Sequence, residues 1–306
     1  MSVEPARLDA EEETPKGIQR RRRLPDHRLG ALWDSIFVDD ALKSRLVSQA
    51  VLNFTLRAKI DRSVLPLHGV ILLVGPPGTG KTSLALGLAH RTAKSFPSGN
   101  FHLLEVNPHE LTSSAMGKTQ RAVSELFSRS VSESAMAGPT IVLLDEVETL
   151  AVDRSKLSLE ANPIDIHRAT DAVLVQLDAL AERHTNLLFV ATSNFPRAID
   201  SAFMSRCDLV VQVPLPNRDA CQQILSDCLA GLGRTYAPIA KLVRAANFSR
   251  CVDECVGLDG RTIRKVLANA MASSPQTALH PEILTIDHVL AAAKAAKVAR
   301  NVEETL

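Results

Sequence analysis

The chain has 306 residues, of which 45% are hydrophobic and 23% charged, and its formal net charge is +1. This is the composition of an ordinary globular protein, and the length predicts two domains or one large domain with an appendage. The near-neutral charge excludes a global basic field that would draw the whole surface to nucleic acid or anionic lipid.

The five cysteines and the apolar runs exclude further classes. The cysteine count is odd and no Cys-x-x-Cys pair occurs, which argues against a disulfide framework and a zinc site. Cys251 and Cys255 could share a helix face, where buried thiols are favoured over metal or redox use. The acidic start, Met1–Thr14, is no secretory signal, and the longest apolar runs are too short to span a bilayer. We therefore expect a soluble, cytoplasmic protein without a membrane partner.

Residues 1–28 carry an acidic run, Glu11–Glu13, and a basic run, Arg20–Arg23. This mixture predicts a flexible charged tail. The arginine run could contact nucleic acid. A solvated charge cluster or a dock for a neighbouring subunit is favoured, because four arginines alone specify little.

From Leu29 onward, apolar runs of strand length alternate with helical patterns. Leu42, Leu46, Ala50 and Leu56 predict a helix that begins near residues 38–40. Runs that are apolar throughout are typical of strands buried on both faces of a parallel sheet. Five such runs occur: Val70–Val74, Phe101–Val106, Thr140–Leu144, Leu187–Ala191 and Leu209–Val213. The alternation predicts an α/β fold over residues 29–216, with three layers and a parallel five-stranded sheet.

The chain after Pro214–Asn217 shows only helical spacing. Apolar residues recur at helical intervals in two sets, and an alanine-rich helix is predicted to follow from Ile286. The two sets are Cys221, Ile224, Leu225, Cys228, Leu229 and Leu232, then Leu258, Ile263, Val266, Leu267 and Ala270. Residues 217–306 are therefore predicted to form a small all-α domain.

A glycine-rich loop directly follows the first strand of the predicted sheet. It reads Gly75-Pro76-Pro77-Gly78-Thr79-Gly80-Lys81-Thr82-Ser83 and precedes a helix predicted to begin near Lys81. The glycines let backbone N–H groups turn inward around phosphates, and the helix N-terminus adds partial positive charge. Lys81 is expected to reach the β- and γ-phosphates and Thr82 to place its hydroxyl on Mg²⁺. The loop predicts ATP and Mg²⁺ as cofactors.

Polar residues also end two other predicted strands. Asp145 and Glu146 follow Thr140–Leu144. Asp145 would support Mg²⁺, and Glu146 would orient and polarise the attacking water. Two acids at a strand end can be plain surface charge, but beside the glycine-rich loop the catalytic interpretation is favoured. Asn194 could bind the attacking water or the γ-phosphate, or form a turn before Phe195; spacing alone does not decide.

With Asp200-x-Ala202-x-x-x-Arg206, these motifs resemble the AAA+ ATPase family across residues 31–298. Within it the chain is similar to the pachytene checkpoint ATPases, whose members remodel HORMA-domain proteins. The elements that carry this narrower match are Leu32-Trp33-Asp34-Ser35 with Lys43-Ser44, the loop through Leu84, Asp145-Glu146-Val147-Glu148-Thr149-Leu150, Ala172-Val173-Leu174, Thr192-Ser193-Asn194 and Gly257-Leu258-x-Gly260-Arg261-x-x-Arg264-Lys265. The resemblance implies an AAA+ P-loop domain followed by a helical lid.

The resemblance also implies roles for residues beyond Glu146. Asn194 matches sensor 1, Arg261 matches sensor 2 on the lid, and Arg206 matches the arginine finger that enters the neighbouring subunit's site. A finger supplied in trans implies a homo-oligomeric ring, with a hexamer as the family expectation.

Two segments match the loops that line the pore of such rings. The first contains Ala115, Met116 and Gly117, where the family commonly has an aromatic residue; Met116 can still pack flexibly on varied side chains. The second is Val152–His167. Both are predicted to contact a peptide in the pore.

About thirty polar residues precede the ATPase core, where eukaryotic relatives carry a folded domain. The chain therefore resembles the compact bacterial branch. There the resemblance implies antiphage operons in which a HORMA protein activates a cyclic-nucleotide synthase, and the ATPase opens the HORMA protein by pulling a terminus through its pore. Two alternatives stay open: a nucleic-acid motor or loader, which the neutral charge disfavours, and a nucleotide-dependent switch, which the complete catalytic set disfavours.

Overall fold

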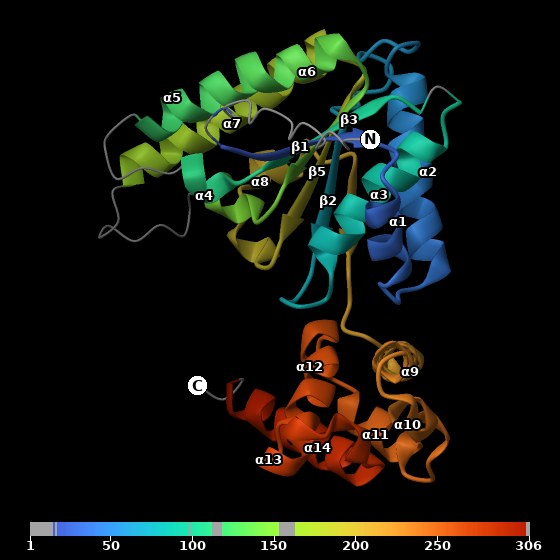
Figure 1. Ribbon diagram of the computed structural model, residues 1–306. Helices are drawn as coiled ribbons and strands as arrows, with labels where there is room; N and C mark the ends of the chain where they lie inside the picture. Colours follow the sequence, from blue (N-terminus) through green and yellow to red (C-terminus); the bar gives the residue numbers. More distant parts are fainter. Residues whose placement is uncertain (1–14, 16, 98, 112–117, 153–162, 304–306) are drawn as a thin grey trace, which may run out of the picture.

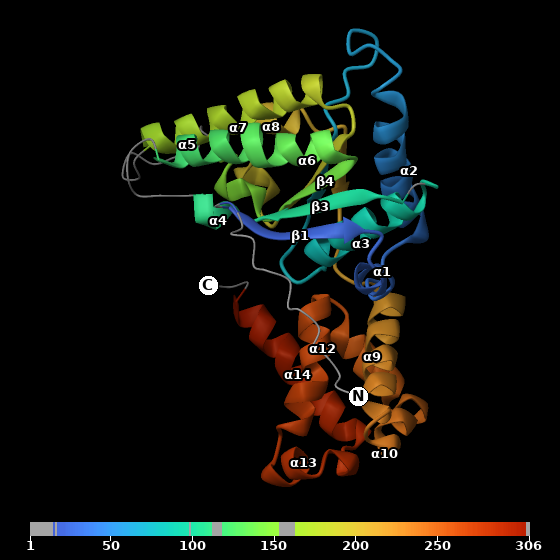
Figure 2. The same ribbon diagram turned by 45° about the horizontal axis from the view of Figure 1, so that its top comes forward.

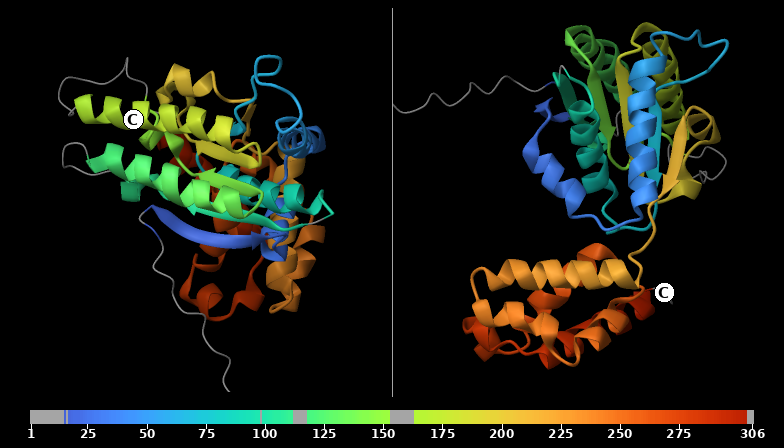
Figure 3. Two further views of the ribbon diagram at one scale, coloured as in Figure 1. Left: turned by 90° about the horizontal axis from the view of Figure 1, so that it is seen from above. Right: turned by 90° about the vertical axis from the view of Figure 1, so that its right-hand side faces the viewer.

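The computed structural model describes residues 15, 17–97, 99–111, 118–152 and 163–303. A central sheet lies between two layers of helices, and a separate group of helices lies below it (Figure 1). A single extended segment that follows the last strand joins the two parts (Figure 3). The predicted α/β fold with a C-terminal helical region is confirmed.

The sheet has the strand order β1-β3-β4-β5-β2-β6, and all strands except β1 are parallel to one another. Its strands are β1 Ile18–Leu24, β2 Val70–Val74, β3 Phe101–Val106, β4 Thr140–Leu144, β5 Leu187–Ser193 and β6 Leu209–Gln212. The central strands β2, β4 and β5 are buried along their whole length. The five predicted strands are confirmed, although β5 runs two residues further and β6 ends one residue earlier.

Strand β1 corrects the sequence analysis twice: the sheet has six strands and is mixed, and the flexible-tail prediction is wrong for residues 18–24. β1 pairs antiparallel with β3 at the edge of the sheet. Ile18 and Leu24 are buried at its two ends, and Arg22 Nε donates to Glu105 Oε1 at 2.7 Å. An edge strand tolerates charged side chains because one of its sides faces solvent. Two apolar anchors and one ion pair therefore suffice to place the arginine run in the sheet.

Helices cover both faces of the sheet (Figure 2). One layer holds α1 His27–Asp34, α2 Asp40–Leu56 and α3 Lys81–Lys94; the other holds α5 Lys118–Glu125, the π-helix η1 Leu126–Val131, α6 Ser132–Ala137 and α7 Pro163–Arg183. Alternate strand residues face opposite layers, so Leu72 joins the core under α7 while Ile71 and Leu73 join the core under α3. Short elements fill the connections: α4 Pro108–Leu111, η2 Val147–Thr149, η4 Pro196–Ala198 and α8 Ser201–Met204.

The C-terminal region has its own hydrophobic core, built mainly from residues 221–293. Its elements are α9 Arg218–Gly233, α10 Ala237–Ala240, η5 Lys241–Arg244, α11 Phe248–Cys255, α12 Gly260–Met271, α13 Pro275–Leu279, η6 Pro281–Ile283 and α14 Ile286–Glu303. Asn217 caps α9 by accepting a hydrogen bond from the Ala220 N–H at 2.9 Å. No strand occurs among the described residues after Gln212, as predicted.

The cysteines of this region are packing residues. Cys251 and Cys255 both lie buried on α11, and burial raises the pKa of their thiols to about 11 and about 12. Thiols with such pKa values stay protonated near neutral pH and are poor nucleophiles. Within the described ranges there is no group of three metal-ligating side chains. None of the helices described is long and apolar enough to cross a membrane.

Candidate active site

A cavity of about 570 Å³ lies where the carboxyl ends of β2, β4 and β5 face the C-terminal helices. Ligands of open α/β sheets bind at this edge. The residues that line the cavity include the loop residues Pro77–Ser83, the strand-end residues Asp145, Glu146, Thr192 and Asn194, and residues of α12 such as Arg261 and Arg264. The structure therefore brings together the glycine-rich loop, both acids, the asparagine and Arg261.

The glycine-rich loop adopts a backbone conformation that residues other than glycine rarely adopt. Gly78 and Gly80 have φ values of 76° and 90°, and a Cβ at Gly78 would collide with the Asp259 carboxylate. Gly80 is also the N-cap of α3, so the helix N-terminus points its free N–H groups into the cavity. The loop is thus built to accept an anion.

Lys81 lies at the base of the cavity and is 5% exposed. Its ammonium group donates to the carbonyl oxygens of Gly75 at 2.9 Å and Pro76 at 2.8 Å. Burial lowers the pKa of Lys81, and the nearby carboxylates of Glu148, Asp145 and Glu146 oppose that shift. The cation is held by neutral carbonyl groups, which a phosphate can replace.

Oxygen donors gather at Asp145. Its Oδ1 accepts hydrogen bonds from the hydroxyls of Thr82 at 2.8 Å and Thr192 at 2.5 Å. Mg²⁺ prefers a carboxylate and hydroxyl or water oxygens. The pair of Thr82 and Asp145 therefore fits Mg²⁺, as the sequence predicts.

Glu146 is oriented from both sides. Its Oε1 accepts a hydrogen bond from Asn194 Nδ2 at 3.2 Å, and its Oε2 lies 3.1 Å from His109 Nε2. Among the described residues Glu146 is the one non-glycine with positive φ, 53°. Its backbone N–H donates to the Thr192 hydroxyl at 3.1 Å. A strained backbone held by these contacts aims the carboxylate at the cavity.

The C-terminal helices contact the glycine-rich loop directly. The Arg261 N–H donates to the Gly78 carbonyl oxygen at 3.3 Å, and Asp259 caps α12 by accepting from the N–H groups of Arg261 and Thr262. Arg264 Nη2 donates to the Ser35 carbonyl oxygen at 2.9 Å. These contacts place Arg261 at the cavity.

Arg206 lies elsewhere. It is not among the described residues that line the cavity, and its guanidinium pairs with Asp178 of α7 at 2.6 and 2.9 Å. Arg206 therefore does not reach the cavity of its own chain. The predicted pore residues Ala115, Met116 and Gly117 lie outside the described residues, as does most of the second predicted pore loop.

Comparison with known proteins identifies the family. The model for the ATPase family associated with various cellular activities (AAA) matches residues 71–215. CD-NTase-associated protein 6 of Pseudomonas aeruginosa is 68% identical over 286 residues, which cover 94% of each protein. The pachytene checkpoint protein 2 homologue of Danio rerio is 30% identical over 89% of this chain and 70% of its own length. The chain belongs to this family of AAA ATPases.

Solved structures agree with this assignment. The structure of PCH-2 from C. elegans superposes with a TM-score of 0.73 at 27% identity, covering 95% of this chain and 77% of that one. The structure of the E. coli MS115-1 HORMA:CdnC:Trip13 complex contains a chain with the same fold, with a TM-score of 0.69, 18% identity, and coverage of 90% of this chain and 94% of that one. As an AAA ATPase, the chain binds nucleotide.

The structure of this AAA ATPase adds site residues that the sequence analysis did not single out. Thr192 bridges Asp145 and the Glu146 backbone, and Glu148 Oε1 accepts from the Asn194 N–H at 3.0 Å. The segment Ser35–Val38 also lines the cavity, beside α12. Thr192 and Glu148 lie inside motifs that carry the family resemblance. His109 carries no local signal in the sequence, because only the fold brings it to Glu146.

Proposed function

We propose that the protein is a Mg²⁺-dependent ATPase that hydrolyses ATP to ADP and phosphate and uses the energy to remodel a protein. The observation that carries this proposal is the pairing of Glu146 with Asn194 in the cavity that also contains Lys81, Thr82 and Asp145. Binding alone would not require a carboxylate held between two side chains beside the phosphate loop.

Each residue has a distinct task. Lys81 exchanges the carbonyls of Gly75 and Pro76 for the β- and γ-phosphates. Thr82 and Asp145 would hold Mg²⁺, which would neutralise charge on the phosphates. Glu146 orients the attacking water and accepts its proton, while Asn194 fixes the carboxylate in place. Arg261 brings positive charge from the lid to the phosphate end of the cavity.

The ATPase works as a ring, for which the family expectation is a hexamer. Arg206 lies away from the cavity of its own subunit, which suits a residue that completes the site of the next subunit. Residues 29–216 form the large ATPase domain and residues 217–306 the lid. Closure of the lid on the nucleotide pivots near residues 215–217 and moves the pore loops.

The client is a HORMA-domain protein. The 68% identical relative is named for its association with a CD-NTase, and the solved E. coli complex combines HORMA and CdnC with Trip13. The ATPase pulls a terminus of its client through the pore and opens it. In bacteria this remodelling would switch off HORMA-dependent cyclic-nucleotide signalling against phage.

A trapped variant tests this proposal. Glu146→Gln protein is loaded with ATP and Mg²⁺ in lysate of its own organism, and the proteins that co-purify are identified by mass spectrometry. We expect a HORMA-fold protein, with or without a nucleotidyltransferase, and none with Lys81→Ala protein as the matched control. Recovery of nucleic acid, or of partners that nuclease treatment removes, would support a nucleic-acid motor instead.

A further inference from the structure

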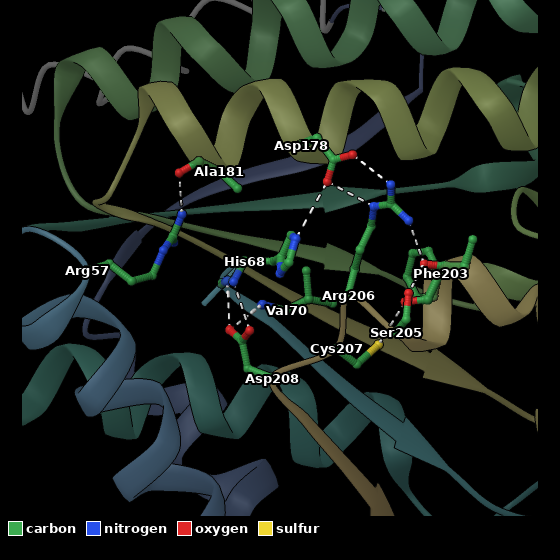
Figure 4. Close-up of polar contacts among 12 residues, drawn as sticks. Arg57, His68, Val70, Asp178, Ala181, Phe203, Ser205, Arg206, Cys207 and Asp208 are labelled. Carbon is green, nitrogen blue, oxygen red and sulfur yellow. Dashed lines mark hydrogen bonds and ion pairs between the residues drawn. The ribbon is translucent and has the colours of Figure 1, made fainter. Parts of the chain in front are cut away.

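The Arg206 guanidinium is bound by acceptors of its own chain (Figure 4). Nε and Nη2 donate to the two carboxylate oxygens of Asp178 at 2.9 and 2.6 Å, and Nη1 donates to the Ala202 carbonyl oxygen at 2.7 Å. The pair is half-buried, with 22% of the Arg206 side chain exposed. The hydrogen bond between them raises the pKa of Arg206 and lowers that of Asp178. All three guanidinium nitrogens therefore already have acceptors.

The backbone that carries Arg206 is fixed on both sides. Its N–H donates to the Phe203 carbonyl oxygen at 3.0 Å. Two residues further on, the Asp208 carboxylate accepts from the N–H groups of residues 68, 69 and 70 at 2.8, 2.7 and 3.1 Å. These hydrogen bonds hold the main chain in place, so only the side chain of Arg206 is free to change position.

The backbone of Asp178 is also held in place. It lies near the end of α7, where the buried Arg57 donates to the Ala181 carbonyl oxygen in the last turn of the helix (Figure 4). Arg57 also donates to the Leu187 carbonyl oxygen at the start of β5 and so ties the helix end to the sheet. His68 Nε2 lies 3.6 Å from Asp178 Oδ1, on the far side from the helix. The carboxylate cannot follow Arg206 far, because its helix end is held.

We propose that Asp178 is a positioning residue that latches Arg206 inside its own subunit and must give it up to the neighbour's ATP. The Nε–Nη2 edge of the guanidinium, which pairs with the two carboxylate oxygens of Asp178, is also the fork that would bind a phosphate bidentately, and this edge cannot bind both anions at once. Release is thus an exchange of one anion for another at a fixed backbone. The latch rests on the proposed role of Arg206 as a finger in trans.

Two-component rings isolate the donated finger. Glu146→Gln subunits supply Arg206 but do not hydrolyse, and Arg206→Ala subunits have an intact site but supply no finger. ATP turnover by the mixture comes from sites that an Arg206 enters from the neighbour. Adding Asp178→Asn to the Glu146→Gln subunits should raise kcat of the mixture about two- to fivefold, the range for loss of a partly exposed ion pair. Asp178→Glu should return the rate to its starting value.

The controls separate the latch from damage to the fold and from the finger itself. Glu182→Gln removes a charge from the same helix at an exposed position and should leave the rate unchanged. Structural damage lowers both rate and Tm, whereas release of a latch raises the rate. An unchanged or lower rate with Asp178→Asn contradicts the latch. No turnover in the original mixture overturns the trans role of Arg206, and the latch with it.

Discussion

The cavity and the Arg206 pair hold their cations in opposite ways. In the cavity, Lys81 is bound by two neutral carbonyl groups, and the helix N-terminus beside it offers free N–H groups. On the other side of the sheet from α3, Arg206 already has a carboxylate as its partner. A cation bound by neutral dipoles attracts an incoming phosphate at once, whereas a cation bound by a carboxylate first has to lose it. We therefore expect a single subunit to bind nucleotide in the cavity, and we expect Arg206 to act, as the proposed latch requires, only when another anion competes for it.

Arg206→Ala is expected to cause the largest loss of kcat. It tests whether Arg206 is needed for turnover. A finger that stabilises the charge of phosphoryl transfer contributes about 10³-fold or more to kcat. We expect that loss in phosphate-release assays, with nucleotide affinity measured by a fluorescent analogue unchanged. Arg206→Lys should recover little, because an ammonium group lacks the fork. Retention of more than a tenth of wild-type kcat by Arg206→Ala would contradict the role.

Glu146→Gln tests the catalytic half of the cavity. Removing the proton acceptor should lower kcat by about 10²- to 10³-fold, while Lys81 and Thr82 still bind ATP with near wild-type affinity. Single-turnover measurement of ATP cleavage separates the chemical step from product release. Glu133→Gln, on the exposed surface of α6, is the matched control. An equal loss of kcat in both variants would show that the loss comes from removing a negative charge and not from the position of Glu146 in the cavity.

Lys81→Ala tests the binding half of the cavity. Loss of a charge-assisted contact to phosphate should weaken ATP binding about 10- to 100-fold. Calorimetric titration of the single subunit with ATP measures this directly, and Lys94→Ala at the far end of α3 provides the control. Wild-type affinity for ATP in Lys81→Ala would mean that the phosphates lie elsewhere in the cavity.

The sequence predicts the cavity residues better than it predicts the Arg206 pair. The glycine-rich loop, Asp145 and Glu146 can be predicted because each group is contiguous in sequence and directly follows an apolar strand. The roles of Arg206 and Arg261 are predicted only by the family resemblance, because a single arginine forms no motif that would indicate its function. Its partner Asp178 is 28 residues away from Arg206 and lies on another element, so only the fold shows the pair.

The edge of the sheet shows the same limit. A run of four arginines is typical of a solvated tail, and the two apolar anchors of β1, Ile18 and Leu24, are too far apart to form a strand pattern. The pairing that forms β1 comes from β3, about eighty residues later in the chain, with Glu105 opposite the arginines. Local composition could not reveal a partner at that distance.

Thr192→Val is expected to cause the smallest loss of kcat. It tests whether the position of the two acids depends on a single hydroxyl. The Thr192 hydroxyl donates to Asp145 Oδ1 and accepts from the Glu146 N–H, so one group contacts both the proposed metal-binding acid and the proposed catalytic acid. Valine keeps the shape and removes both hydrogen bonds, each worth about 1 kcal/mol. We expect kcat to fall about 5- to 30-fold with a higher Mg²⁺ requirement, measured by titrating Mg²⁺ at saturating ATP. Thr170→Val, which removes a buried hydroxyl from α7 outside the cavity, should lower Tm without changing that requirement. An unchanged Mg²⁺ requirement in Thr192→Val would mean that Asp145 needs no such support, and that its pairing with Thr82 alone fixes the metal-binding position.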